Sequence, residues 1–204
     1  MLTRLHVKGF KNLVDTEILF GPFTCVAGAN AVGKSNLFDA IRFLSLLSSG
    51  KLDEAGRAIR AEGARNADVR SLFTRQSTGQ LGEMEFDLDM IVPPSALDDL
   101  RQEALASTTF LNYKVRLRYR EDPEERRRNG ELELLSEHLS YIRQGEAKKR
   151  LGFKFNDQWF QTAVTGRKSS PLISTSVEGD DRTVVTLHMD GPTEKNVHKR
   201  GTGY

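Results

Sequence analysis

The stretch Gly28-Ala29-Asn30-Ala31-Val32-Gly33-Lys34-Ser35 decides the fold of this chain. It fits the pattern G-x-x-x-x-G-K-[ST], a glycine-rich loop that binds phosphate groups. The two glycines let the backbone turn tightly and approach the phosphates. The loop N–H groups and the start of the next helix then form an anion site. We expect Lys34 to reach between the β- and γ-phosphates of a nucleotide and Ser35 to bind Mg²⁺ through its hydroxyl.

The residues on both sides of this loop predict the strand and the helix that the motif requires. Alternating apolar residues predict strands over 5–10 and 14–20, and a turn signal at 21–22 follows. The apolar run at 23–27 predicts a buried strand directly before the loop. Residues 34–47 predict a helix whose apolar side chains cover most of its circumference, so we expect it to be buried on several sides.

Residues around the loop also carry a family resemblance. The first expected strand ends in Phe10-Lys11-Asn12, Asn30 occupies the third position of the loop, and an apolar helix follows it. This combination resembles the opening of the RecF, SMC, Rad50 and OLD-type ATPases, the DNA-associated and phage-defence branch of the ABC ATPase class. Ala31 replaces the glycine usual in that family, a change that the backbone tolerates at negative φ. The resemblance covers residues 1–50 well and residues 51–204 only in outline.

The resemblance implies ATP and Mg²⁺ as cofactors, Lys34 as the catalytic residue and Ser35 as the metal ligand. It implies that nucleotide contacts extend beyond the loop. The expected binding residues are Lys11, Asn12, Gly28, Ala29, Asn30, Ala31, Val32, Gly33, Lys34, Ser35 and Asn36. Two interpretations of Lys11 stay open, because it lies either beside the nucleotide or at a solvated strand end. Phe10 is expected to pack in the core.

In that family two heads sandwich two nucleotides, and the closed state grips or senses DNA. The resemblance therefore implies a homodimer or higher oligomer, DNA as a partner, and an associated nuclease as a further partner. The implied role is in DNA repair or anti-phage defence. We interpret residues 1–50 as the nucleotide-binding start and residues 51–204 as the rest of the same lobe.

Beyond the loop helix the chain predicts mostly strands. The strand patterns cover residues 83–92, 110–119, 132–142, 152–155, 159–164 and 183–189. Ser95 is a candidate N-cap for a helix that would end near residue 106, and residues 51–75 show a helical pattern. The predicted fold class is therefore α/β, the N-terminal lobe of an ABC-ATPase head, with a β-rich antiparallel section.

Two segments rich in basic side chains each allow two interpretations. Lys114, Arg116 and Arg118 share one face of the strand expected at 110–119. Such a face fits a nucleic-acid backbone, and it equally fits the solvated face of an antiparallel sheet. Residues 51–75 hold six basic against four acidic side chains, which suits either a phosphate-facing element or a solvated helix face.

The sequence offers no clear acidic strand end for ATP hydrolysis. The nearest match, residues 184–190, ends in Asp190 but continues with Gly191 where a glutamate would activate water. No LSGGQ-like signature or switch histidine is recognisable, and the four histidines lack metal-ligand spacing. In the family these parts lie in a C-terminal lobe. We therefore expect the chain to be the first half of a head, completed by its own C-terminal lobe or by a second chain.

Composition excludes several other classes of protein. The 204 residues carry 30 basic and 28 acidic side chains, a formal charge of +2, so any nucleic-acid surface must be a local patch. One cysteine, Cys25, excludes a disulfide framework. No apolar run reaches the ~20 residues of a membrane span, and the N-terminus lacks a signal-peptide pattern, so we expect a cytoplasmic chain. The alternatives are a nucleotide-binding switch without hydrolysis, the ATPase subunit of a membrane transporter, and a small P-loop kinase.

Overall fold

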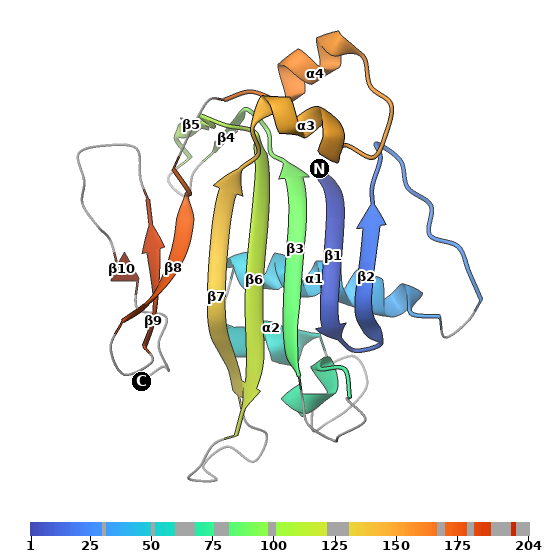
Figure 1. Ribbon diagram of the computed structural model, residues 1–204, viewed down its shortest axis with the longest axis vertical. Helices are drawn as coiled ribbons and strands as arrows, with labels where there is room; N and C mark the ends of the chain where they lie inside the picture. Colours follow the sequence, from blue (N-terminus) through green and yellow to red (C-terminus); the bar gives the residue numbers. More distant parts are fainter. Residues whose placement is uncertain are drawn as a thin grey trace.

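A large antiparallel sheet organises the molecule. The computed structural model describes residues 1–29, 32–49, 52–59, 68–75, 82–97, 101–121, 131–166, 170–178, 182–188 and 197–198. Within them, eight strands pair in the order β10-β9-β8-β7-β6-β3-β1-β2 (Figure 1). These strands are β1 (Leu2–Phe10), β2 (Leu13–Leu19), β3 (Glu83–Ile91), β6 (Phe110–Arg120), β7 (Glu131–Tyr141), β8 (Ile173–Glu178), β9 (Arg182–Leu187) and β10 (Val197–His198).

Helices cover one face and one end of this sheet. The described helices are α1 (Lys34–Ser49), α2 (Leu52–Ala58), α3 (Gln144–Arg150) and α4 (Asp157–Ala163), and a short 3₁₀ turn spans Val69–Leu72. Figure 1 shows α1 and α2 across one face, and α3 and α4 at the end of the sheet where β1 begins. Strands β1 and β2 come from the predicted nucleotide-binding start and pair within the same sheet as the later strands.

The core lies between the sheet and α1. Alternate residues of the central strands point toward the helix, which meets them with apolar side chains spaced three or four apart. The buried residues include Leu5, Val7, Met84, Phe86, Val115 and Leu117 from the strands, and Leu37, Ala40, Phe43 and Leu47 from α1. At its centre the rings of Phe10, Phe43 and Phe86 lie 5.4–5.9 Å apart. The expected core position of Phe10 is confirmed.

The opposite face of the central strands is polar. Three basic residues of β6 each pair with a carboxylate of a neighbouring strand: Lys114 with Glu85 at 2.9 Å, Arg116 with Glu83, and Arg118 with Glu133 at 2.6 Å. Cross-strand pairs of opposite charge are typical of a solvated sheet face. Because these cations are neutralised within the sheet, the structure favours the solvated-face interpretation of this strand over a nucleic-acid surface.

The sequence prediction for residues 152–164 was wrong. Two strands were expected there, and the structure instead has α4, preceded by α3, which the sequence analysis missed. Asn156 caps α4 by accepting a hydrogen bond from the N–H of Trp159 at 2.7 Å. Phe160 and Val164 lie four residues apart and pack with Ala147 and Leu151 into a second apolar cluster. Helical periodicity therefore explains this segment better than strand alternation does.

The helix expected from Ser95 to residue 106 was also wrong. The described residues form a hairpin of β4 (Ser95–Leu97) and β5 (Glu103–Leu105). Arg101 has a φ of 62°, a left-handed conformation that stops a right-handed helix. The N–H of Ala106 closes the hairpin by bonding the carbonyl of Pro94 at 2.8 Å.

The buried strand expected at residues 23–27 was the third wrong prediction. These residues have no regular structure, and the ring of Phe23 is 88% exposed. A buried strand needs neighbours that satisfy its backbone groups. Within the described residues β2 is at the edge of the sheet and pairs only with β1, so nothing there pairs with 23–27.

The other predicted elements are confirmed: the strands that became β1, β2, β3, β6, β7 and β9, and the helix that became α1. The expectation that α1 is buried on several sides was wrong, because Phe38 is 57% exposed on the side away from the sheet. Of the helical pattern at 51–75, the structure describes α2 and the 3₁₀ turn. Asp190 lies outside the described residues.

Candidate functional site

The glycine-rich loop leads directly into α1, whose first residue is Lys34. The Lys34 ammonium donates hydrogen bonds to the carbonyls of Gly28 at 2.6 Å and Ala29 at 2.5 Å. The two ends of the loop that the structure describes are therefore joined through the lysine, whereas Asn30 and Ala31 lie outside the described residues. The N–H of Leu37 bonds the Gly33 carbonyl at 3.0 Å and starts the helical ladder.

Gly33 has a backbone conformation and a neighbour that both require glycine. Its φ is 103°, and an added Cβ would lie 2.9 Å from the side-chain oxygen of Asn12. A larger residue would therefore be strained and would push Asn12 away. This close approach joins the loop to the turn between β1 and β2.

The start of α1 is suited to bind an anion. The first N–H groups of a helix have no partner within the helix, and its dipole favours negative charge there. The first turn of α1 contains no acidic residue, so no carboxylate opposes a phosphate. Ser35 is exposed beside Lys34, and Val32 is exposed on the loop.

This donor set also fits Mg²⁺ as it is bound with a nucleotide. Mg²⁺ takes few protein ligands and fills its octahedral shell with water and phosphate oxygens, so the single exposed hydroxyl of Ser35 fits its needs. Among the residues that the structure describes, no group of three or more His, Cys, Asp or Glu side chains converges as a metal site.

The turn after β1 brings Lys11 and Asn12 to α1. Gly9 has a φ of +72°, and an added Cβ would lie 2.2 Å from the carbonyl oxygen of Glu83. This glycine breaks the alternation of β1 and lets Phe10 enter the core. Lys11 has a φ of 50°, and its N–H bonds the Leu72 carbonyl at 2.7 Å. The turn thus lies against Glu83 of β3 on one side and is hydrogen-bonded to Leu72 on the other.

The side chains of this turn contact two positions on α1. The amide of Asn36 donates to the side-chain oxygen of Asn12 at 2.7 Å, next to Gly33. The Lys11 ammonium pairs with Asp39 at 2.5 Å. The structure thus brings together Asn12, Gly33 and Asn36 at the loop, whereas the Lys11 ammonium lies farther along the helix. Sequence analysis missed Asp39, although its place three residues after Asn36 puts it on the same helix face.

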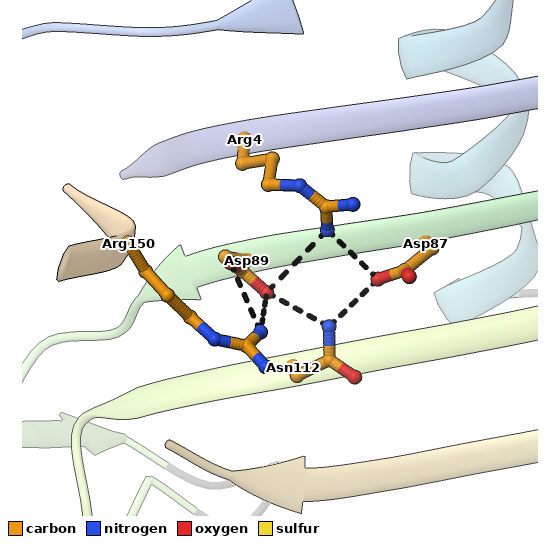
Figure 2. A pocket seen from close by; sticks show the side chains of 5 residues that line it. All are labelled: Arg4, Asp87, Asp89, Asn112 and Arg150. Carbon is orange, nitrogen blue, oxygen red and sulfur yellow. Dashed lines mark hydrogen bonds and ion pairs between the residues drawn. The ribbon is translucent and has the colours of Figure 1, made fainter. Parts of the chain in front are cut away.

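A second polar cluster lies on the other face of the sheet, around a hollow of about 180 Å³ (Figure 2). Asp89 is completely buried and is bonded by Arg150 of α3 at 3.1 Å and by the Asn112 amide at 2.8 Å. Arg4 pairs with Asp87 at 3.1 Å. Burial lowers the pKa of Arg4, but the hydrogen bonds that its guanidinium donates to Glu17 and Asp87, together with the negative charges of Asp87 and Asp89, outweigh this effect and raise the pKa.

Two arginines and two aspartates balance the charge of this cluster. A buried carboxylate is stable only when it is paired and hydrogen-bonded, and the contacts of Asp89 meet that condition. We therefore interpret the cluster as the anchor that holds α3 against β3, and not as a ligand site.

A glycine-rich loop whose ends are joined through a lysine and that opens a helix packed on a β-sheet defines a P-loop NTPase domain. The model of the AAA domain family matches residues 4–162. The chain belongs to this family, and the predicted α/β class with a β-rich antiparallel section is confirmed.

Similar proteins narrow the class further. The chain is 33% identical over 88 residues to the DNA replication and repair protein RecF of Synechocystis sp., a match that covers 43% of this chain and 22% of that protein. It is 42% identical over 50 residues (24% of the chain) to the RecF of Parabacteroides distasonis, and 30% identical over 96 residues (47% of the chain) to that of Thermosynechococcus vestitus. These matches confirm the resemblance to ABC-class ATPases of the RecF/SMC type.

The matches span only part of these relatives, 14–24% of their length. Most of each RecF protein therefore lies outside the match. Among the described residues, no helix is long and apolar enough to cross a membrane. The cytoplasmic location expected from the sequence stays a prediction.

Proposed function

We propose that this chain is the ATP-binding lobe of a DNA-associated ABC-type ATPase head. The observation that carries the proposal is the Lys34 ammonium, held by the carbonyls of Gly28 and Ala29 at the start of α1. A triphosphate at this helix start would offer stronger, charge-assisted partners. Lys34 would then exchange carbonyl oxygens for phosphate oxygens, while the loop N–H groups bind the other oxygens.

In this proposal the lobe neutralises charge and does not activate water. Phosphoryl transfer depends mainly on positioning and on stabilising negative charge at the phosphate oxygens. Lys34, the N–H groups at the start of α1 and Mg²⁺ bound through Ser35 supply that stabilisation. The first turn of α1 contains no acidic side chain that could act as a general base. We assign the base to a C-terminal lobe or to a second chain.

Exposed apolar side chains around the loop support this completion. Phe23 precedes the loop, Val32 lies on it and is 61% exposed, and Phe38 is exposed on α1. Exposed apolar side chains of this size are typical of an interface, so we propose that the completing part covers them. The run 23–27 has the composition of a buried strand, so pairing with a strand of the completing part would satisfy both its backbone and its side chains.

The role of the completed head rests on the family. We propose that ATP drives two heads together, and that the closed state acts on DNA, with a nuclease as a further partner. The RecF relatives are named for DNA replication and repair, which favours repair over phage defence.

Binding of Mg·ATP to the chain, measured by isothermal titration calorimetry, tests the site. Wild type and Lys149→Ala, a control at an exposed lysine of α3, should bind alike, and Lys34→Ala should lose binding. Equal binding by wild type and Lys34→Ala would contradict the proposed site.

Steady-state ATP turnover tests the completion of the head. No turnover above the Lys34→Ala background supports a lobe that awaits its partner, and it also fits the alternative of a switch without hydrolysis. Turnover that disappears in Lys34→Ala would place a general base within these residues and contradict the need for a second part.

A further inference from the structure

We propose that Asp39 is a positioning residue of the nucleotide site. Through Lys11, and together with the Asn12–Asn36 pair, it fixes the start of α1 against the turn between β1 and β2. This inference deepens the proposed function and rests on it, because positioning matters only if the loop binds a nucleotide.

The first step is that hydrogen bonds hold the turn itself. The Lys11 N–H bonds the Leu72 carbonyl at 2.7 Å, and the Lys11 carbonyl accepts a hydrogen bond from the Thr74 hydroxyl at 2.8 Å. The Thr74 N–H bonds the Gly9 carbonyl at 2.8 Å. Lys11 also keeps a left-handed φ of 50°. A residue keeps such a conformation only when its surroundings determine it, so the turn is a fixed support.

The second step is that two anchors join this support to one face of α1. Asn36 and Asp39 are three residues apart, so they project from the same helix face and are separated by about 4.5 Å along the axis. One anchor would let the helix rotate about it. Two anchors, at 2.7 Å to Asn12 and 2.5 Å to Lys11, oppose both rotation and sliding.

The third step is that the Lys11–Asp39 pair is sheltered enough to matter. The two side chains are only 21% and 27% exposed, and the ammonium lies 5.7 Å from the centre of the Phe10 ring. A partly buried ion pair is screened less than a surface pair. Without Lys11, Asp39 would be an unpaired carboxylate about 7.5 Å along the helix from Lys34, where it would repel a phosphate.

The anchors act on Lys34 through the backbone. Lys34 follows Gly33 directly, and Gly33 lies against Asn12. The apolar face of α1, with Leu37, Ala40 and Phe43 in the core, secures the fold of the helix independently. Loss of the Lys11–Asp39 pair should therefore change nucleotide affinity more than it changes folding.

The test is a double-mutant cycle on Mg·ATP affinity, measured by calorimetry. We expect Asp39→Asn and Lys11→Met each to weaken affinity about tenfold, the order expected for one charge-assisted hydrogen bond. The double variant should bind Mg·ATP no more weakly than the single variant with the lower affinity, because both substitutions remove the same interaction. Asp39→Glu should recover part of the loss. Asp157→Asn, which removes an exposed ion pair with Lys148, is the matched control and should bind as wild type does.

Several outcomes would overturn the inference. Affinity of Asp39→Asn within twofold of wild type would do so, as would a double variant whose loss is the product of the single losses. Loss in Lys11→Met with full affinity in Asp39→Asn would show that Lys11 acts on the nucleotide directly. If Asp39→Asn lacks native circular dichroism, Lys11→Met and Asp39→Glu decide by the same criteria. Absence of binding by wild type would refute the proposed function itself, and this inference with it.

Discussion

Replacing Gly9 with alanine puts a methyl group where the β1–β2 turn has no room. The added Cβ would lie 2.2 Å from the carbonyl oxygen of Glu83 on β3, and the φ of +72° is unfavourable for any residue with a side chain. The left-handed conformation costs about 1–2 kcal/mol. Forcing two paired strands apart adds about 1–3 kcal/mol, as other overpacking substitutions do. Gly9→Ala should therefore lower the free energy of unfolding by about 2–5 kcal/mol.

Urea denaturation gives this free energy by linear extrapolation. Gly145→Ala in α3 is the matched control, because nothing lies within 4 Å of a Cβ added there. Alanine is more favourable than glycine within a helix by up to about 1 kcal/mol, and Gly145 lies in the first turn of α3, so the control should be as stable as wild type or more stable. A free energy of unfolding for Gly9→Ala within about 0.5 kcal/mol of wild type, the range of neutral surface changes, would refute the argument.

Gly9→Ala should also weaken nucleotide binding. Gly9 precedes the residues that place Lys11 and Asn12 against α1, so a shift of the turn moves both anchors. We expect Gly9→Ala to reduce the rise in melting temperature that Mg·ATP produces, and Gly145→Ala to leave that rise unchanged.

Three further predictions concern the core, the loop and an exposed ion pair. Phe43→Ala removes a fully buried ring that contacts Phe10 and Phe86 and should cost about 3–5 kcal/mol in urea denaturation; a cost below about 1 kcal/mol, typical of surface changes, would contradict this core. Lys34→Ala should abolish the Mg·ATP-dependent rise in melting temperature, because the phosphates lose their main cationic partner; an equal rise in both proteins would remove Lys34 from the site. The hydrogen bond from Lys148 lowers the pKa of Asp157 below the usual value of an aspartate, so the pair stabilises the fold above that usual pKa, and this stability is lost as the pH falls through the lowered pKa of the folded state. Asp157→Asn should therefore flatten the pH dependence of the melting temperature below about pH 4, and an unchanged acid limb would count against the pair.

Local sequence patterns were sufficient to predict the loop and the strand and helix near it. The alternation of β1, the glycine pattern at 28–35 and the apolar spacing of α1 each lie within a short stretch of chain. A backbone turn and a helix start depend on their own residues, so their sequence signals are strong. The same signals were sufficient to recognise the family, which the match over residues 4–162 supports.

Contacts between distant residues decided the rest. Residues 23–27 have the composition of a strand, but a strand forms only where a neighbour pairs with it. Asn156 caps a helix through the N–H of Trp159, but the sequence pattern of this segment resembled strand alternation. Only the packing of Phe160 in one cluster with Ala147 shows that the segment is helical. The basic side chains of β6 have the pattern of a nucleic-acid surface, and only the register with β3 and β7 shows that carboxylates neutralise them.

The candidate site shows most clearly which features the sequence predicts and which depend on the tertiary structure. The sequence by itself determined the loop, its lysine and its serine, because eight consecutive residues contain them. Only the tertiary structure brought Lys11 to Asp39, 28 residues along the chain, and Asn12 to Asn36. Those pairings depend on the break in β1 at Gly9 and on the packing of α1 over Phe10. Each is a consequence of how the sheet and helix pack together, which no local pattern encodes.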